Sequence, residues 1–346
     1  MYKVGFRSAN LLKMSLVTSA AMWAICLLAL AETTNTAEAS SLPQNGKIAF
    51  TRNGAIYTVE PDGSNLSQLT SSTSLDRPVW SPDGTKIAFS QIREGITFRS
   101  SAVSGISVMS ADGSNVRDLH TSKTNGSLLP AWLPDGTKLA FNGVEAPPPY
   151  SFDIYMMNPD GSNLLNLTKT PEQSEGWPAF SPNGSRMCFS RYGGIYVMNV
   201  DESDPSLLVE VDDTPQGCNW SPDGTRIAFE DIFEVYVINA DGSARTALTS
   251  KSAKDTEPDW SPDGTRITFA SDRDGDFDIY TMDADGSDVA QVTNSPGDDF
   301  SPDWQPLPRS TVLHQPDTGG LSLLLVAIAL LFSGGVLFYA GVKRNT

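Results

Sequence analysis

Residues 260–269 read WSPDGTRITF, and recognisable copies of this phrase recur along most of the chain. The copies begin at Trp80, Trp132, Phe180 and Trp220. Proline presets φ and glycine accepts a positive φ, so the Pro-Asp-Gly segment favours a tight turn between two strands. Each copy is therefore expected to form a β-hairpin, and its repetition about every 40 residues indicates a repeat array.

A second hairpin follows each copy of the phrase. Its turn reads Asp-Gly-Ser in most units, whereas the fourth unit has Asp201-Glu202-Ser203-Asp204 instead. Between the turns, β-branched and aromatic residues alternate with polar ones, and no 3.6-residue period is sustained, which excludes a helical array. Each unit is therefore expected to hold four short strands, and the six units predict an all-β fold.

The first unit begins at Gly46 and lacks the opening aromatic strand. An orphan copy of that strand, Ser301–Pro306, follows the sixth unit and aligns with Glu257–Pro262. A closed ring, in which this last strand completes the first sheet, removes the edges that an open stack would expose. The sequence thus predicts a six-bladed β-propeller over residues 46–305, closed by one C-terminal strand plus three N-terminal strands.

These residues carry a family resemblance. The repeat reads WSPDG, two variable residues and IAF, followed by IY-x-M-x-ADGS. It resembles the repeat of the TolB-like β-propeller family, which is related to tryptophan-aspartate repeats. The resemblance covers nearly all of residues 46–306 and implies a six-bladed propeller. The family includes a periplasmic protein that docks envelope partners and the propeller domains of prolyl oligopeptidase relatives, so the fold alone does not assign a function.

The composition narrows the class of partner. The 346 residues carry a formal net charge of −17, and 39% of them are hydrophobic, which is enough for a core. The two ends are net basic, with three basic residues in 1–31 and a net charge of +2 over 309–346, so the centre carries −22. Because phosphate binding requires a cationic surface, the sequence predicts no nucleic-acid partner.

The N-terminal residues 1–31 have the features of a secretory signal peptide. The segment begins with the basic residues Lys3, Arg7 and Lys13. A largely apolar run from Met14 follows and ends in the small-x-small sequence ALA at residues 29–31. An uncleaved membrane anchor is the alternative, and both predict export. Residues 32–45, rich in Thr, Ala and Ser, are expected to be a linker.

The C-terminal end predicts a surface anchor. Residues 321–342 are apolar and uncharged, roughly the 20 residues of a transmembrane helix, and a basic cytoplasmic tail, 343–346, follows. In the preceding linker, 306–320, the motif QPDTGG resembles a sortase sorting signal, although glutamine stands where leucine is usual. Sortase would cut between Thr318 and Gly319 and join Thr318 to the cell wall; a plain membrane anchor is the alternative.

Three cysteines are present, and Cys26 lies in the expected signal peptide. Cys188 and Cys218 permit one disulfide between neighbouring repeats in an oxidising compartment. The spacing does not show whether their Cα atoms come within about 7 Å of each other. We favour two separate buried thiols.

An enzyme is not expected. The chain lacks a Gly-x-Ser-x-Gly motif and the additional hydrolase domain of prolyl oligopeptidase relatives. Because His314 lies in a linker, His120 alone would have to serve a Ser-His-Asp site, and a histidine-rich metal site, as in propeller lyases acting on oligogalacturonate, is equally hard to build. No cofactor is predicted.

Calcium is the metal for which the sequence offers a set of candidate ligands. Hard oxygen ligands can hold Ca²⁺, and four carboxylates fall within residues 271–278, although their spacing does not match an EF-hand. The candidate ligands are Asp272, Asp274, Asp276 and Asp278. The alternative, which we prefer, is a loop between second and third strands in which Asp278 bonds backbone amides.

Five tryptophans occupy the same place in their repeats, and we predict that they pack between blades rather than stack on a ligand. They are Trp80, Trp132, Trp220, Trp260 and Trp304. Trp177 departs from the pattern and is expected on a connecting loop before the fourth blade.

The longest connections between second and third strands lie in the adjacent blades two and three, at residues 91–105 and 142–152. Insertions confined to one face of a repeat ring often mark a binding face, and aromatic and arginine side chains supply interface anchors. The predicted binding residues are Ile92, Arg93, Phe98, Arg99, Tyr150 and Phe152.

The sequence therefore predicts an exported, surface-tethered and monomeric propeller that binds a partner protein, with a glycan as the other ligand considered. The alternative is an enzyme or binding protein that acts on an envelope or extracellular polysaccharide or peptide at the central opening of the ring. Convergent titratable groups at that opening would favour the alternative.

Overall fold

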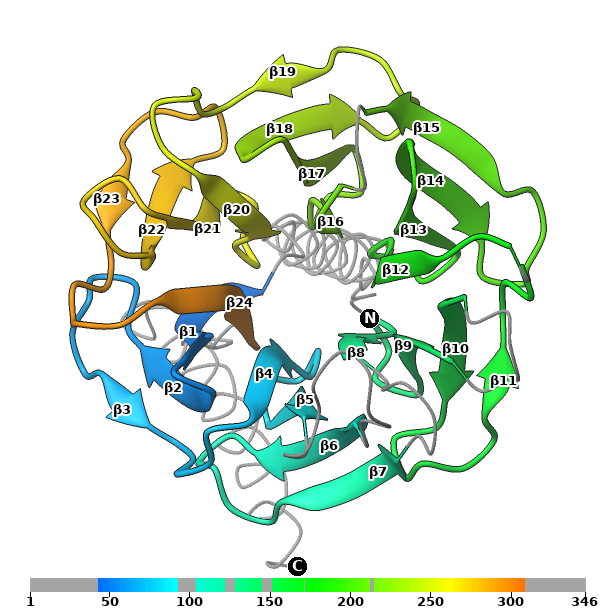
Figure 1. Cartoon of the computed structure of the whole chain (residues 1–346), viewed down its shortest axis with the longest axis horizontal. Helices are drawn as coiled ribbons and strands as arrows, with labels where there is room; N and C mark the ends of the chain where they lie inside the picture. The colour runs from blue at the N-terminus through cyan, green and yellow to red at the C-terminus, as the bar shows by residue number, and fades with distance from the viewer. Residues whose placement is uncertain are drawn as a thin grey trace, which may run out of the picture. The chain divides into compact units, whose positions relative to one another are not determined.

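The computed structural model describes residues 43–92, 104–121, 128–144, 151–170, 172–211 and 215–308. In these residues the chain forms six four-stranded antiparallel sheets arranged around a common centre (Figure 1). The predicted all-β, six-bladed propeller is confirmed.

The strands follow one another from the centre outward in every blade. Blade 1 contains β24 (Asp299–Leu307), β1 (Gln44–Arg52), β2 (Ala55–Val59) and β3 (Ser67–Gln68). Blade 2 contains β4 (Leu75–Trp80), β5 (Lys86–Ile92), β6 (Ser104–Ser110) and β7 (Arg117–Thr121). Blade 3 contains β8 (Leu128–Trp132), β9 (Leu139–Gly143), β10 (Asp153–Met157) and β11 (Leu165–Asn166).

The other three blades repeat this order. Blade 4 contains β12 (Glu175–Phe180), β13 (Arg186–Arg191), β14 (Gly194–Asn199) and β15 (Ser206–Glu210). Blade 5 contains β16 (Cys218–Trp220), β17 (Arg226–Asp231), β18 (Glu234–Asn239) and β19 (Thr246–Ala247). Blade 6 contains β20 (Asp255–Trp260), β21 (Arg266–Ser271), β22 (Asp278–Asp283) and β23 (Ala290–Gln291).

The ring closes in blade 1 as the orphan strand predicts. β24 pairs antiparallel with β1, with Trp304 opposite Ile48 and Asp299 opposite Arg52. Arg52 and Asp299 also form a buried ion pair, and the Asp299 side chain is 0% exposed. One C-terminal strand and three N-terminal strands therefore complete the same sheet (Figure 1).

The Pro-Asp-Gly turns owe their shape to the aspartate as well as to proline and glycine. In blade 2 the Asp83 carboxylate accepts hydrogen bonds from the Thr85 backbone N–H at 3.0 Å and from the Ser81 hydroxyl at 2.6 Å. In blade 4 the amide oxygen of Asn183 accepts the equivalent bond from Ser185 N–H, at 3.0 Å. An acceptor two residues before the N–H is the requirement, so asparagine can replace aspartate there.

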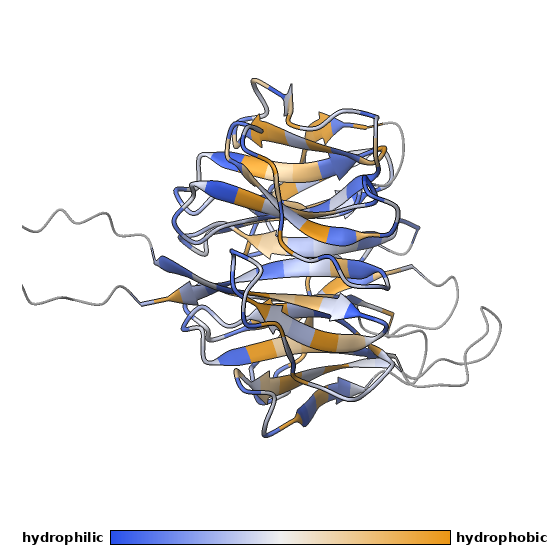
Figure 2. Cartoon of the chain, turned by 90° about the vertical axis from the view of Figure 1, so that its left-hand side faces the viewer, coloured by the Kyte–Doolittle hydropathy of each residue, from blue (hydrophilic) through white to orange (hydrophobic). Residues whose placement is uncertain are grey.

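Six hydrophobic clusters hold the ring together, and each spans two neighbouring blades. Trp220, for example, packs with Ile195 of blade 4 and Phe229 of blade 5. Trp304 packs with Ile279 of blade 6 and Phe50 of blade 1. The tryptophans therefore pack between blades, as predicted. Figure 2 shows the matching pattern along the strands, where hydrophobic residues alternate with hydrophilic ones.

Four blades add an arginine that lies over a stacked Phe–Tyr pair and bonds a carboxylate. In blade 6, for example, Arg273 lies 4.6 Å from the Tyr280 ring centroid and 2.9 Å from an oxygen of Asp255. Arg52, Arg191 and Arg245 have the same arrangement in blades 1, 4 and 5. Because each carboxylate is largely buried, the arginine neutralises a charge that would otherwise be costly.

The expectation of two free thiols is wrong. Cys188 on β13 and Cys218 on β16 form a disulfide, with their Cα atoms 6.3 Å apart. Cys218 stands where most blades have the proline of the Pro-x-Trp sequence, on the strand that packs against blade 4. The covalent bond therefore links neighbouring blades 4 and 5.

Several predicted segments fall outside the described residues. These are the signal peptide, most of linker 32–45, residues 309–320 of the second linker, the membrane helix 321–342 and the basic tail. Within the part of the chain that the structure describes, no helix has the length and hydropathy needed to cross a bilayer. Export and anchoring, including the role of Thr318 and Gly319, stay predictions.

Candidate functional site

The innermost strand of each blade contains one residue with an unusual backbone. Each has a positive φ and occupies the same place in its repeat, three residues before the aromatic residue that packs between blades. The six are Arg77 (52°), Leu129 (64°), Trp177 (54°), Gly217 (74°), Glu257 (54°) and Ser301 (55°). In five blades the pairing register with the neighbouring strand also shifts at this point, which marks a β-bulge.

These bulges are informative because five of the six residues are not glycine. A non-glycine residue in the left-handed region costs about 1–3 kcal/mol, and such strain gathers at functional sites. The next residue is proline in five blades, and a residue before proline normally adopts an extended conformation. The closed ring overrides that local preference and brings the bulge residue of every blade to the centre.

All six bulge residues line a central cavity with a volume of about 310 Å³. The residues that follow them on the same strands continue its wall to the Pro-Asp-Gly turns, where Pro82 and Pro134 line it. The cavity is thus formed by the innermost strands β24, β4, β8, β12, β16 and β20, which surround the centre in Figure 1.

The wall of this cavity has two chemically different sides. Blades 3 and 4 supply an apolar and aromatic side, which consists of Leu129, Pro130, Trp132, Trp177, Pro178 and Phe180. Blades 6 and 1 supply a polar, acidic side, which consists of Glu257, Asp259, Ser301 and Asp303. We call the first the aromatic side and the second the acidic side.

Arg77 of blade 2 bridges the two sides. Its Nη2 lies 2.7 Å from Oε1 of Glu257 in blade 6, and its guanidinium lies 3.8 Å from the ring centroid of Trp177 in blade 4. Its Nε is 3.8 Å from a carboxylate oxygen of Asp76, the preceding residue. One arginine therefore joins three of the six blades at the centre of the ring.

The carboxylate of Glu257 is held from a second direction. Its Oε2 accepts hydrogen bonds from the Ser301 backbone N–H at 2.6 Å and from the Ser301 hydroxyl at 3.2 Å. Ser301 and Glu257 are both bulge residues, of neighbouring blades 1 and 6. The hydrogen bonds and the ion pair with Arg77 fix the position of this carboxylate, so it presents a defined charge to the cavity.

Other carboxyl groups of the acidic side hold protons unusually well. Removal from water raises the pKa of Asp259 to about 7, although its carboxylate accepts a hydrogen bond from Trp304 N–H at 3.1 Å. Removal from water and the charge of Asp259 raise the pKa of Asp303 well above its ordinary value. Burial raises the pKa of Asp76 as well. The cavity wall can therefore change its charge near neutral pH.

Glu230, at the end of β17, lies next to this group. Its side chain is buried, and its Oε2 has no hydrogen-bond partner among the described residues. Burial, followed by the charge of Glu257, raises the pKa of Glu230 to about 8. At neutral pH this carboxyl group is therefore mostly protonated.

Replacing Glu230 with glutamine should make stability less dependent on pH. The folded protein keeps the Glu230 proton up to about pH 8, whereas the unfolded chain loses it near pH 4.5, so the contribution is present below pH 4.5 and declines as pH rises to about 8. The slope is about 1.4 kcal/mol per pH unit. Urea unfolding at pH 6 and pH 8 should show wild type losing about 2–3 kcal/mol more than Glu230→Gln.

The matched control is Glu172→Gln, because Glu172 is exposed to solvent. This variant should lose the same free energy as wild type between the two pH values. If Glu230→Gln and wild type have parallel profiles, Glu230 is not protonated in the folded protein.

The predicted loop site is only partly within the described residues. Arg93, Phe98, Arg99 and Tyr150 lie outside them, and Ile92 is the last residue of β5. Phe152 precedes β10 and is half-buried, and its backbone N–H donates to the Ser174 hydroxyl at 3.2 Å. These six residues stay a predicted binding surface.

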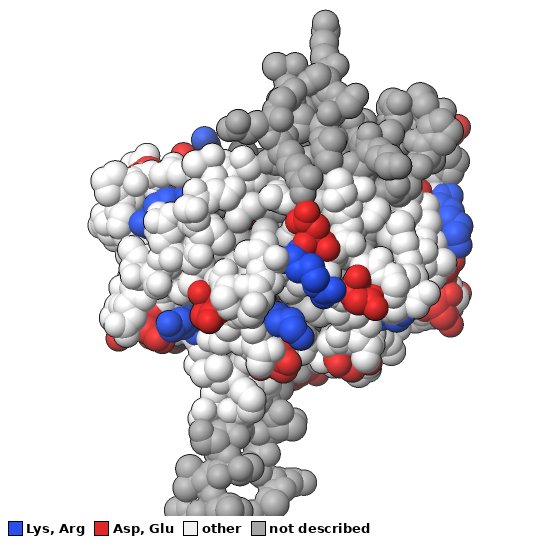
Figure 3. All heavy atoms as spheres, turned by 90° about the horizontal axis from the view of Figure 1, so that it is seen from below, with Lys and Arg blue, Asp and Glu red and all other residues white. Residues whose placement is uncertain are grey.

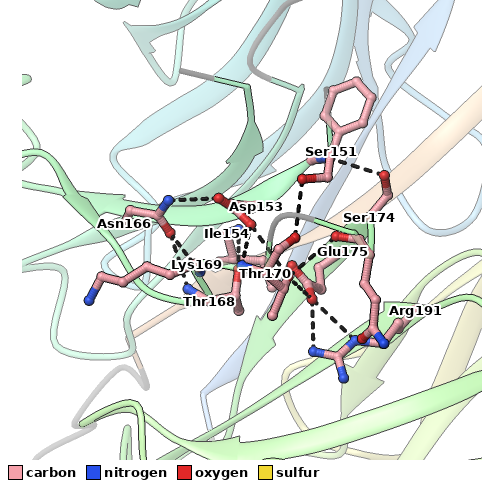
Figure 4. Close-up of polar contacts among 12 residues, drawn as sticks. Ser151, Asp153, Ile154, Asn166, Thr168, Lys169, Thr170, Ser174, Glu175 and Arg191 are labelled. Atoms are coloured by element: carbon pink, nitrogen blue, oxygen red, sulfur yellow. Dashed lines mark hydrogen bonds and ion pairs between the residues drawn. The ribbon is translucent and has the colours of Figure 1, made fainter. Parts of the chain in front are cut away.

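The polar network around Asp153, Thr170 and Glu175 joins blades 3 and 4 (Figure 4). Asp153 accepts a hydrogen bond from Thr170 N–H at 3.0 Å, and the Thr170 hydroxyl donates to Glu175 at 2.5 Å. Glu175 also forms an ion pair with Arg191 at 2.7 Å. Burial raises the pKa of Glu175, and Thr170 is the largest of the contacts that oppose this rise. The network joins blades 3 and 4 at the start of β12 and thereby fixes the strand that carries Trp177.

The four carboxylates considered for calcium all accept hydrogen bonds from protein groups. Asp272 accepts from Lys254 N–H, Asp276 accepts from Gly297 N–H, and Asp274 accepts from the side chain of Gln291. Asp278 bonds the side chains of Gln291 and Thr293, so the expectation of backbone amide partners is wrong for this residue. Over the described ranges, no group of three or more acidic, histidine or cysteine side chains is placed to hold a metal.

His120 lies away from the cavity. It belongs to β7, the outermost strand of blade 2, where its ring centroid is 5.3 Å from that of Phe141. Its position against a core phenylalanine fits packing, and His314 lies outside the described residues.

The surface of the ring also bears on the class of partner. On the side shown in Figure 3, acidic and basic side chains lie beside one another, without a broad basic patch. That nucleic acid is not a partner stays a prediction from the net charge of the sequence.

Sequence reasoning missed the central site, and its placement of Trp177 was wrong. Trp177 lies within β12 rather than on a connecting loop, and it faces the cavity. The signal was available as a contrast between repeats: the residue before Pro-x-Trp varies, while the proline and the tryptophan each recur in five of the six repeats. Only the ring shows that these varying positions meet.

Residues 150–329, slightly more than half of the chain, match the family model described as TolB beta propeller domain. Among solved structures, the chain is similar to TolB from Acinetobacter baumannii, with 19% identity, a TM-score of 0.64 and coverage of 77% of this chain and 69% of that one. A chain of a nidogen–laminin complex is similar with 11% identity and a TM-score of 0.64, over 76% and 99% of the two chains.

An oligogalacturonate lyase from Vibrio parahaemolyticus is similar with 17% identity and a TM-score of 0.50, over 68% of this chain and 74% of the lyase. No curated protein matches the chain. Identities this low show a shared fold and leave the activity to be argued from the site.

Proposed function

The chain belongs to the TolB beta propeller domain family, and from that premise we propose that it is an exported binding module. Its partner is a protein, and a segment of that protein enters the central cavity. The proposed export and surface tethering rest on the N-terminal signal-like segment and on the C-terminal apolar segment, with either membrane anchoring or sortase attachment at Thr318.

The convergence of the six bulge residues supports this proposal most strongly. In a repeat ring, a position that serves only packing carries similar residues, as the tryptophans do. The bulge position instead carries arginine, leucine, tryptophan, glycine, glutamate and serine, and all six line one cavity. A set of different side chains at one central place is suited to recognising one particular ligand.

The size of the cavity limits what can enter it. Ligand pockets have volumes of about 300–1,000 Å³, and this cavity, at about 310 Å³, is at the lower end. It can hold one large side chain or a short segment of a partner, with the rest of the partner outside. Because the blades are closed and the bulges are fixed, binding should require little ordering of the propeller.

The loops of blades 2 and 3 stay part of the proposal as a second contact surface. Their predicted anchors are Ile92, Arg93, Phe98, Arg99, Tyr150 and Phe152. The cavity would then fix a short segment and the loops would contact the surrounding surface of the same partner.

Site-specific crosslinking should identify the partner. A photoreactive amino acid at Leu129, which lines the cavity, should give one discrete crosslinked protein in intact cells that produce the full chain. The same amino acid at Tyr192, which is 77% exposed on a turn of blade 4, is the matched control. Recovery of the product from cells treated with an external protease would report on surface exposure.

The proposal predicts a protein product that depends on the Leu129 position. Identical products from Leu129 and Tyr192, or no protein product from Leu129 while the propeller remains folded, would contradict it.

A second candidate is an enzyme that acts on an extracellular polysaccharide or peptide at the same opening. The raised pKa of Asp259 and of Asp303 favours it, since such groups can exchange protons near neutral pH. Against it, each carboxylate already accepts a backbone N–H, from Trp304 and Trp80 respectively. Turnover in a screen of glycans and peptides that is lost in Asp259→Asn would support the enzyme.

A further inference from the structure

The central cavity contains a site for a positive charge, and the protein fills it with its own Arg77. We propose that a lysine or arginine side chain of the partner displaces Arg77 and takes its place between Glu257 and Trp177. This inference names the chemistry of the segment that enters the cavity, and it rests on the proposed function for the identity of that segment as part of a protein.

The charged groups around Arg77 favour a cationic ligand. Asp76, Glu257, Asp259 and Asp303 belong to the innermost strands around Arg77, and Glu230 adjoins Glu257. Arg77 is the one basic residue among the described residues that line the cavity. Acidic groups therefore outnumber basic ones at this place, and a cation is the complementary ligand.

The aromatic side of the cavity also suits a basic side chain. Trp177, Leu129 and Phe180 of the aromatic side lie across the cavity from the acidic side. Lysine and arginine carry their charge on an apolar stem, and their charged ends are attracted to the face of a tryptophan ring. A basic side chain can therefore contact both sides at once, whereas an acidic ligand would meet like charges and a purely apolar one would leave the carboxylates unpaired.

The contacts of Arg77 show how a cation is held at this place. Its guanidinium makes the two contacts that a ligand cation would need, the ion pair with Glu257 and the stack on Trp177. Its backbone has a φ of 52°, and its side chain remains 20% exposed. Arg77 is thus an accessible residue on a strained segment, and a partner residue that replaces it keeps both interactions and lets Arg77 move toward solvent.

Glu230 gives independent support for an additional cation. Its side chain is only 4% exposed, and its Oε2 has no hydrogen-bond partner among the described residues, although its carboxyl lies close enough to Glu257 for the two charges to interact. A buried carboxyl oxygen without a partner is unfavourable. The charge of a lysine or arginine side chain that enters beside Glu257 would favour the ionised form of Glu230.

The same groups make binding depend on pH. Asp76, Glu230, Asp259 and Asp303 all have a raised pKa through burial, and a bound cation would favour their ionised forms. Arg77 and Glu257 are the charged groups that face them. Binding of a basic ligand should therefore release protons and become tighter as the pH rises from 6 to 8.5.

The test measures binding of N-acetyl-arginine methylamide to the full chain by isothermal titration. Arg77→Ala removes the internal competitor and should bind this probe at least tenfold more tightly than wild type. Adding Glu257→Gln to Arg77→Ala should remove that gain, whereas adding Glu172→Gln, a change of an exposed glutamate, should preserve it. N-acetyl-glutamate methylamide and N-acetyl-leucine methylamide are the acidic and apolar probes.

Equal binding of the three probes to Arg77→Ala, or a preference for the leucine or glutamate probe, would overturn the proposal. So would an unchanged affinity for the arginine probe relative to wild type. Arg77→Gln, which keeps most of the side-chain length, serves as a second variant if Arg77→Ala does not fold. Crosslinking from Leu129 tests the protein partner separately, so a failed cation site and a failed binding function give different results.

Discussion

Replacing Trp304 with alanine should lower the free energy of unfolding by about 3–5 kcal/mol, the range for removal of a buried aromatic side chain. Trp304 is 3% exposed and packs with Ala270 and Ile279 of blade 6 and with Ile48 of blade 1. Its loss leaves a cavity at the point where the two ends of the propeller meet. Denaturant unfolding followed by circular dichroism measures the change.

Tyr192→Ala is the control for this result, because the Tyr192 side chain is 77% exposed. That substitution should change the free energy of unfolding by no more than about 0.5 kcal/mol. If Trp304→Ala and Tyr192→Ala have equal midpoints, the C-terminal strand does not contribute to the stability of the ring and the closure described above is incorrect.

Asp299→Ala should have an effect of similar size, about 3–5 kcal/mol, because it leaves a buried arginine without its partner. Asp299 on β24 and Arg52 on β1 form the ion pair that crosses the closing sheet, with side-chain exposures of 0% and 8%. An arginine guanidinium is not deprotonated in proteins, so Arg52 stays charged in the variant and cannot avoid the penalty by losing its proton. Denaturant unfolding again gives the free energy.

The exposed pair Lys169–Glu202 is a matched control within the same ring. Its N–O distance is 2.8 Å, but the two side chains are 59% and 32% exposed, so Glu202→Ala should change stability by less than about 1 kcal/mol. Comparable losses in Asp299→Ala and Glu202→Ala would show that burial does not determine the value of these pairs.

The fold could be predicted from the sequence because the repeats state it several times. The Pro-Asp-Gly turns set the hairpins, the aromatic residue at the start of each unit marks the blades, and the orphan strand around Trp304 shows how the ring closes. Each of these signals is local and is repeated, so an altered copy such as the one at Asn183 does not obscure it.

The candidate site could not be predicted in the same way. Trp177 and Glu257 follow Arg77 by 100 and 180 residues along the chain, and only ring closure brings them into contact with it. Their positive φ values also oppose the extended conformation that the following proline favours. The repeats are recognised in the sequence by the residues that they share, whereas this site consists of a position at which they differ.

The disulfide illustrates a similar limit. Cys188 belongs to the second strand of blade 4 and Cys218 to the first strand of blade 5. Whether such residues meet depends on how far neighbouring blades are shifted relative to each other along the axis of the ring, and no local sequence pattern sets that shift. The sequence could name the pair and the blades but could not decide between a bridge and two thiols.

The centre of the ring, rather than its repeated surface turns, is the part of the molecule to which we assign the proposed function. The repeated residues build a closed scaffold, and the bulge positions of five blades supply five different side chains to the cavity. Arg77 links the acidic side to the aromatic side, at the place where we propose that a basic group of the partner binds.

The most direct measurement is a crystal structure of Arg77→Ala bound to N-acetyl-arginine methylamide. The account predicts the guanidinium of the probe between the Glu257 carboxylate and the Trp177 ring, at the place that Arg77 occupies in the wild-type protein. A probe bound elsewhere on the propeller, or a cavity that stays without the probe at saturating concentration, would contradict it.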